Sequence, residues 1–173
     1  MRRILPIILI ALLASCSFVS EEKEKSEKIA RPAIILENAE YTLGQSGENP
    51  IFIESTLMSF YSAEERATAE NLKFIQYDDE GNPSITGSAD YADIDTSART
   101  MDLSGHVSLE QHGSNMHIEA ESLYFDSSSS EIEAEGDVRV SSDDGIFSGT
   151  GFKGDLREDS YSFSSIKEGV FNL

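Results

Sequence analysis

The chain has 173 residues, 39% of them hydrophobic and 26% charged, and its 32 acidic side chains against 13 basic ones give a net charge of −19. A charge of this sign argues against a surface of clustered lysines and arginines for phosphates, so nucleic acid is not an expected partner. The single cysteine rules out an internal disulfide, and the length suits one domain with one sizeable core.

The first 15 residues have the features of a bacterial export signal. Arg2 and Arg3 precede an apolar stretch, residues 4–14, which is shorter than the roughly 20 residues that span a bilayer. It ends in the sequence LASC at residues 13–16, which is similar to a lipobox, and Cys16 is therefore the expected site of lipid modification. An uncleaved N-terminal anchor with an incidental cysteine is the alternative, and either arrangement tethers the protein to a membrane.

A polar connection follows the signal. Residues 20–31 are almost all Glu, Lys and Ser, without apolar periodicity, as in a solvated linker. We therefore expect three parts: a lipoprotein signal peptide over residues 1–15, a lipid anchor and disordered linker over 16–32, and a folded domain over 33–173.

The folded part shows the alternation of a half-buried β-strand. Apolar and polar residues alternate with a period of two in residues 100–110 and 131–140, and no helical pattern of similar length occurs. The domain is therefore predicted to be all-β. The expected inward rows are Met101, Leu103, Gly105, Val107 and Leu109 in the first run, and Ile132, Ala134, Gly136, Val138 and Val140 in the second.

An internal repeat of about 31 residues relates these two runs. Each apolar member of the first lies 31 residues before its counterpart, and Asp95 maps onto Asp126 with the same offset. Each unit reads as two strands joined by a polar turn, with turns predicted at residues 78–83, 95–97, 111–115, 127–130 and 143–145. Such hairpins predict one antiparallel sheet, which must curl into a sandwich or jelly roll to hide its apolar face.

No pattern of reactive residues indicates catalysis. His106, His112 and His117 have no cysteine or ordered carboxylate partners for a metal site. Residues 78–82 lack the bidentate glutamate of a calcium loop, and no serine lies in a nucleophile elbow. We therefore expect a protein that binds rather than an enzyme, without a cofactor or metal.

The inward apolar face is the candidate binding surface. Its side chains either fill a closed core or line a trough for a lipid, and periodicity alone leaves both readings open. Phe74, Tyr91, Tyr124 and Phe125 are further inward candidates. The residues expected to contact lipid are Met101, Leu103, Val107, Leu109, Ile132, Val138, Val140 and Phe147.

Two segments carry a resemblance to a known family. They are ADYADIDTSARTMDLSGHVSL at residues 89–109 and AESLYFDSSSSEIEAEGDVRV at residues 120–140. Both resemble the OstA-like β-jelly-roll units shared by the lipopolysaccharide export proteins LptA and LptC. The length, the N-terminal tether and the segments GTGFKGDL (149–156) and YSFSSIKEGVF (161–171) fit the LptC-like branch, and the resemblance covers about residues 33–173.

The resemblance implies a periplasmic lipid-binding component of an export bridge. Such a protein accepts lipopolysaccharide, or a related glycolipid, from an inner-membrane ABC transporter of the LptB-LptF-LptG type and passes it to an LptA-like partner. The two edge strands of the sheet would dock these neighbours. The expected location is the periplasmic side of the inner membrane, with the outer membrane as the alternative.

Two departures from that family leave an alternative function open. The chain carries a lipobox where LptC proteins usually have a transmembrane helix, and its acidic charge would repel lipid A phosphates. The alternative is a structural or surface-displayed β-rich lipoprotein without lipid transfer activity. A hydrolase on a β scaffold is a third candidate, for which the sequence offers no residue set.

Overall fold

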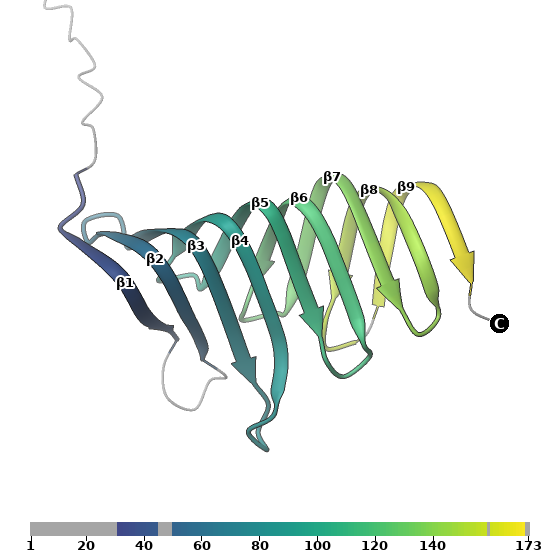
Figure 1. Ribbon diagram of the computed structural model, residues 1–173, viewed down its shortest axis with the longest axis horizontal. Helices are drawn as coiled ribbons and strands as arrows, with labels where there is room; N and C mark the ends of the chain where they lie inside the picture. Colours follow the sequence, from purple (N-terminus) through teal and green to yellow (C-terminus); the bar gives the residue numbers. More distant parts are fainter. Residues whose placement is uncertain (1–30, 45–49, 159, 172–173) are drawn as a thin grey trace, which may run out of the picture. The chain divides into compact units, whose positions relative to one another are not determined.

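The computed structural model describes residues 31–44, 50–158 and 160–171, and within them the chain forms nine β-strands. Each strand pairs antiparallel with its neighbours in the sequence, so the nine form one sheet without crossover connections (Figure 1). The predicted signal peptide and Cys16 lie outside the described residues. The strands are β1 (Ile34–Leu43), β2 (Ile51–Tyr61), β3 (Arg66–Tyr77), β4 (Pro83–Asp95), β5 (Thr100–Gln111), β6 (Met116–Asp126), β7 (Glu131–Ser142), β8 (Gly145–Asp155) and β9 (Ser160–Phe171).

The architecture agrees with the sequence pattern. The prediction of an all-β antiparallel sheet is confirmed, and the open, twisted sheet is consistent with a β-jelly roll. Strands β5 and β7 begin and end 31 residues apart, and β4 and β6 end at Asp95 and Asp126, which share that offset. The repeat in the sequence is therefore a repeat of hairpins in the sheet.

A row of backbone irregularities crosses the sheet and bends its strands. The pairing register shifts within every strand pair from β4–β5 to β8–β9. Positive φ angles, the left-handed region that favours Gly and Asn, occur at Asn38, Asn71, Gly105, His106 and Gly151. We call these five residues the bulge row. Bulges bend strands and increase their twist, and in Figure 1 the strands curve over a common crest.

The bend brings the two halves of the sheet face to face around an apolar core. The ring of Phe74, near the end of β3, stacks on that of Phe125, near the end of β6, with centroids 5.9 Å apart. These two positions lie on opposite halves, so the contact spans the interior. The core continues on both walls with side chains of 0–1% exposure: Met58, Leu72, Ile94, Met101, Leu103, Leu109, Ile118, Ile132, Val140 and Phe152.

Three predicted inward residues do not point inward: Tyr91 and Gly136 lie at irregularities of the pairing, and Tyr124 alternates with buried neighbours. Ala89 and Ala92 lie three residues apart and are both buried, so the irregularity in β4 turns Tyr91 outward, where it is 38% exposed. Tyr124 alternates with buried neighbours on β6 and is only half-buried. Gly136 lies at the register shift of β7 and is exposed. The prediction that these three residues point inward is therefore wrong.

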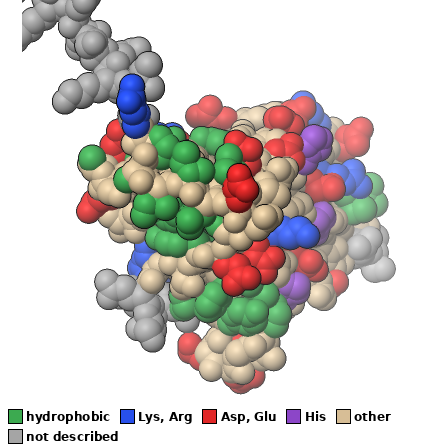
Figure 2. Space-filling model, turned by 60° about the vertical axis from the view of Figure 1, so that its left-hand side comes forward, with side chains coloured by type: hydrophobic (Ala, Val, Ile, Leu, Met, Phe, Trp, Pro, Cys, Tyr) green, Lys and Arg blue, Asp and Glu red, His purple; other side chains and the backbone are tan. Residues whose placement is uncertain are grey.

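The apolar interior reaches solvent at both edges of the sheet. Ile34 and Leu36 on β1 are 53% and 42% exposed, and Ile166 and Phe171 on β9 are 62% and 70% exposed. Figure 2 brings the β1 end forward and shows hydrophobic side chains gathered there. Within the described residues, each end of the core is therefore an exposed apolar surface beside the open edge of a strand that is paired on its other side.

Replacing Phe125 by alanine should lower the free energy of unfolding by about 3–5 kcal/mol, because it removes a buried ring and leaves a cavity against Phe74. Urea unfolding, monitored by circular dichroism, measures the loss of unfolding free energy. Tyr91→Ala is the matched control, since its ring lies on the outer face and should cost much less. Equal losses for the two variants would contradict the assignment of inner and outer faces.

Candidate functional site

The eight residues predicted to contact lipid all lie on the inner face and are buried. They come from both walls: Met101, Leu103 and Ile132 from one half, and Val107, Leu109, Val138, Val140 and Phe147 from the other. Seven belong to the central core. Phe147 lies toward the C-terminal edge, in contact with the rings of Tyr161 and Phe171 at centroid distances of 6.4 and 5.0 Å.

The interior between the walls is filled by side chains. Met101, Leu109 and Ile132 are fully buried, and the stacked rings of Phe74 and Phe125 join the two walls. Close-packed protein interiors have few voids larger than a water molecule. A lipid bound between the walls must therefore take the place of contacts that the walls now make with each other.

A cleft of about 450 Å³ lies where the turns of the two half-sheets meet. We call this line the seam. Its first lip is formed by the turns at residues 78–82 and 112–115 with the adjoining strand ends, and its second lip by the turns at residues 62–65, 96–99, 127–130 and 156–158. Apolar Ile85 and Leu156 line the cleft and are 5% and 4% exposed, so its floor is the core itself.

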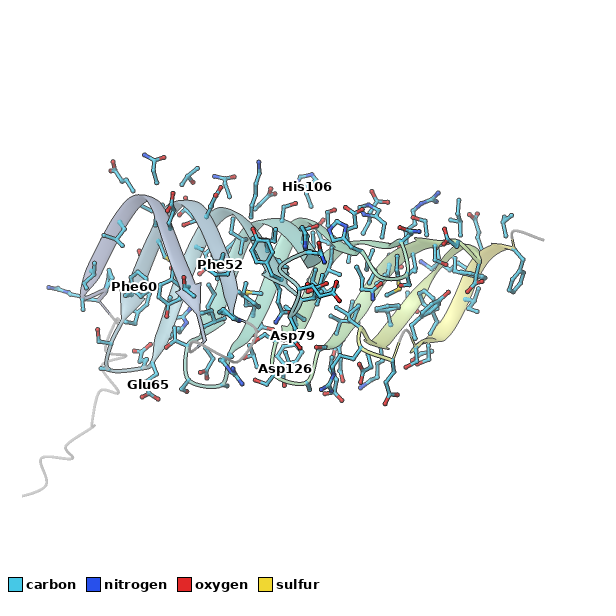
Figure 3. All side chains as sticks on the ribbon, turned by 90° about the horizontal axis from the view of Figure 1, so that it is seen from below. Phe52, Phe60, Glu65, Asp79, His106 and Asp126 are labelled. Carbon is cyan, nitrogen blue, oxygen red and sulfur yellow. The ribbon has the colours of Figure 1, made fainter. Side chains whose placement is uncertain are left out.

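Figure 3 shows both sides of the seam near the middle of the domain. Asp79 belongs to the first lip, and Asp126 precedes the second. His106, in the bulge row, lies on the opposite side of the domain in this view. The bend and the seam are therefore separate borders of the folded sheet.

Buried glutamines close the seam from the first lip. Gln76 and Gln111 are 5% and 9% exposed, and both line the cleft. The Nε2 of Gln111 donates to the backbone carbonyl of Leu156, 3.3 Å away on the second lip, while its Oε1 accepts from the backbone N–H of Ser114 at 2.8 Å. The side chain of Gln111 thus joins the two lips and also holds the turn that follows it.

Sequence reasoning missed these glutamines, although a signal for them exists. Gln76 continues the inward alternation of Leu72 and Phe74, and Gln111 continues that of Val107 and Leu109. A polar residue in phase with an apolar row marks the point where an inner face reaches a rim. Only the pairing of distant hairpins shows which residues it meets there.

The turns of the second lip are joined to one another by hydrogen bonds. Each turn donates a backbone N–H to the last residue of the preceding turn on the same rim, which has a positive φ. The hydroxyls of Thr96, Ser127 and Ser128 add further bonds to carbonyls of the preceding turn. The backbone bonds are Thr96 to Glu65 at 2.8 Å, Ser127 to Arg99 at 3.2 Å and Leu156 to Ser130 at 3.0 Å.

An aspartate organises the turns at residues 96–99 and 127–130 from within. The carboxylate of Asp95 accepts from the backbone N–H groups of Ser97 and Ala98, and the bond from Ala98 is the main cause of its lowered pKa. Burial raises the pKa of Asp126, but its bonds from Ser128 and Ser129 outweigh this and leave the pKa lowered. Both carboxylates therefore favour the folded turn when ionised, and this contribution is lost as the pH falls through their folded pKa values.

The outer face is polar and carries ion pairs rather than a reactive cluster. Arg66 forms a bidentate pair with Asp93, with Nε 2.6 Å from Oδ1, and His106 lies 2.7 Å from Asp90 through Nδ1. Hydrogen bonding to Asp90, with the charges of Asp90 and Glu121, raises the pKa of His106 above its usual 6.5. Within the described strands and turns, no group of three or more His, Cys, Asp or Glu side chains is placed to hold a metal ion.

The described part of the chain is therefore an all-β protein of the β-jelly-roll type. Its single antiparallel sheet folds over an apolar interior and has two open edges and a cleft along its rim. The family model for lipopolysaccharide-assembly, LptC-related proteins matches residues 5–169, nearly the whole chain. The chain belongs to this family, which takes part in lipopolysaccharide transport at the cell envelope. No curated protein matches the chain. Among the described residues, no helix is long and apolar enough to cross a membrane.

Replacing Asp90 by asparagine should lower the pKa of His106, because it removes the charged partner of the imidazole. A pH titration of the His106 ring signals by NMR measures the change. Since the folded pKa lies above the unfolded value, the pair contributes to stability below about pH 6.5, and the contribution is lost as the pH rises through the folded pKa. An unchanged His106 titration in the variant would show that the pair does not form in solution.

Proposed function

We propose that this protein binds the acyl chains of lipopolysaccharide, or of a related glycolipid, between the two halves of its sheet. It accepts the lipid from an inner-membrane ABC transporter of the LptB-LptF-LptG type and passes it to an LptA-like partner. The observation that carries the proposal is an apolar interior that runs from β1 to β9 in a member of the LptC-related family. Binding and transfer, not catalysis, are the proposed activity.

The two ends of the sheet suit docking to neighbours. Among the described strands, β1 and β9 each have one edge without a partner strand, and an open edge can add a strand from another chain. At both edges the interior is exposed, at Ile34 and Leu36 on one side and at Ile166 and Phe171 on the other. A strand added at either edge would extend the sheet and the apolar face together.

The charge of the domain limits where the polar part of the lipid can lie. The net charge is −19, and phosphate groups would be repelled by most of the surface. Arg99 and Arg157 both line the seam cleft, with hydroxyls of the serine-rich turn at residues 127–130. The lipid headgroup would therefore lie at the seam, with its acyl chains inside.

The filled interior favours one alternative, a structural β-rich lipoprotein. Its core would stay closed because nothing enters it, and its edge strands would serve assembly alone. The two functions differ in whether lipid reaches the inner face.

A photo-crosslinking residue at Val107 or Val138 in the native bacterium should give lipid adducts, because both side chains belong to the inner face. The same residue at Glu135, which is exposed on β7, is the matched control and should give none. Mass spectrometry of the adduct identifies the lipid. The same chemistry at Phe171 should give protein adducts from a partner at the β9 edge. Absence of lipid adducts at both inner positions would favour the structural lipoprotein.

Replacing Cys16 by alanine should release the protein from the membrane into the periplasmic fraction, because the predicted acylation site is lost. Fractionation and intact-mass measurement test this, with Ser17→Ala as the neighbouring control. If the alanine variant stays in the membrane fraction, the N-terminal segment itself is the anchor, as in the uncleaved alternative.

A further inference from the structure

A second cleft, of about 650 Å³, lies on the outer face of the half-sheet that ends in the second lip. It crosses β4 to β9 between that lip and the bulge row, and Gly151 of the bulge row lines it. We call this surface the outer cleft. The proposed lipid binding takes place on the inner face and does not involve it.

Small side chains form the floor of the outer cleft. Ser104 pairs with Ser122 across β5 and β6, and Gly151 on β8 lines the same hollow. Gly151 has a φ of 63°, and a Cβ at this position would collide with the side-chain oxygen of Ser164 on β9. The floor therefore presents hydroxyl and peptide groups, and the space above it is left open.

Two tyrosine rings lie beside this floor. Tyr91 on β4 is 38% exposed, and Tyr124 on β6 is half-buried. Tyr91 pairs with Ser104, and Tyr124 pairs with Asp102, so both rings adjoin β5. Two strand spacings, roughly 10 Å, separate the strands that carry the rings, a distance comparable to two sugar residues of a glycan chain. An exposed tyrosine offers an apolar face with a polar tip.

The charged groups of the outer cleft are mainly hydrogen-bond acceptors. Four carboxylates and one lysine line it, and two of the carboxylates have cationic partners, as in the pair of Glu133 with Lys153 at 2.7 Å. Among the described residues, Asp102 and Glu135 form no ion pair. Their oxygens can accept hydrogen bonds from the hydroxyls of a ligand, whereas phosphate or carboxylate groups would be repelled.

Ring faces, hydroxyls and acceptor carboxylates together fit an uncharged oligosaccharide. The C–H face of a sugar packs on an aromatic ring, and the hydroxyls at its edge donate to carboxylates. A basic peptide fits less well, because two of the four carboxylates are already neutralised and the remaining lining is hydroxyl and aromatic.

Two sources of such sugars exist in the cell envelope: the transported glycolipid and the glycan strands of the cell wall. The sugars next to the acyl chains of lipopolysaccharide carry phosphates, which the carboxylates of the outer cleft repel. The backbone of a wall glycan carries no charge, and a strand of it is long enough to cross six β-strands. The charge of the cleft therefore favours the wall glycan.

We propose that the outer cleft binds a glycan strand of the cell wall, with sugar rings stacked on Tyr91 and Tyr124 and sugar hydroxyls bonded to Asp102 and Glu135. The inference goes beyond the proposed lipid binding and requires only that the domain lies in the periplasm. Binding on the outer face fixes the domain to the wall and leaves the inner face available for lipid.

Titration of the purified full-length protein with the N-acetylglucosamine pentamer, an uncharged analogue of the wall glycan, tests the site. Amide signals of the outer cleft should shift and saturate in NMR spectra. Tyr91→Ala and Tyr124→Ala should each weaken binding about fivefold, the effect of losing one ring contact, whereas Tyr91→Phe should keep the affinity. Tyr77→Ala is the matched control, because Tyr77 is also 38% exposed but lies outside the outer cleft. Absence of saturable binding, or equal losses with Tyr77→Ala and Tyr91→Ala, would overturn the proposal.

Co-sedimentation of the full chain with purified cell-wall sacculi tests the natural ligand. The wild-type protein should sediment with the sacculi, and the variant with both Tyr91→Ala and Tyr124→Ala should bind about twentyfold more weakly. Binding should persist at high salt, because contacts to an uncharged glycan are not screened. Sedimentation that salt abolishes, or that the double variant leaves unchanged, would contradict the proposal.

Two further probes separate the wall glycan from the other candidate ligands. They are tetralysine, for a basic peptide, and the lipid-free oligosaccharide released from the bacterium's own lipopolysaccharide. Tighter binding of either probe than of the pentamer at the outer cleft would overturn the wall glycan as the ligand.

Lipid adducts at Val107 and Val138 report on the proposed function independently. The double tyrosine variant should form them as the wild type does, because its inner face is unchanged. Adducts without glycan binding would overturn the glycan site alone, and glycan binding without adducts would overturn the lipid-binding function alone.

Discussion

The structure depends on hiding one apolar face of a single open sheet. In the part of the chain that the structure describes, the nine sequential strands have no second sheet or helix layer to cover them, so the sheet must cover itself. It does so by bending its strands, and the bulge row supplies left-handed residues for the bend in β1, β3, β5 and β8. The contact between Phe74 and Phe125 exists because of that bend.

A self-covering sheet has borders of different kinds. The bend is a continuous border, the two edge strands are open to other chains, and the seam is a line of turns that meet through side chains. Among the described strands, the outer sides of β1 and β9 have backbone groups without partners in the sheet, and the proposed docking of neighbours would take place there.

The polar side chains differ between the outer face, the rim and the interior of the sheet. Carboxylates cover the outer face and give the chain its charge of −19, while Asp95 and Asp126 fold back to bind the N–H groups of their own turns. Buried amides are confined to the rim, at Gln76 and Gln111. The interior itself is apolar.

The sequence by itself determined the strands, their repeat and most of the inner face. Alternation of period two is a local property, so Met101, Leu103, Ile132 and Val140 could be assigned to the core from their neighbours alone. The 31-residue offset likewise followed from the chain. Only the tertiary structure decided the outward direction of Tyr91, because one extra residue in a bulge reverses the alternation beyond it. The seam also needed the folded sheet, since Gln111 and Leu156 are 45 residues apart and meet only when the sheet folds over.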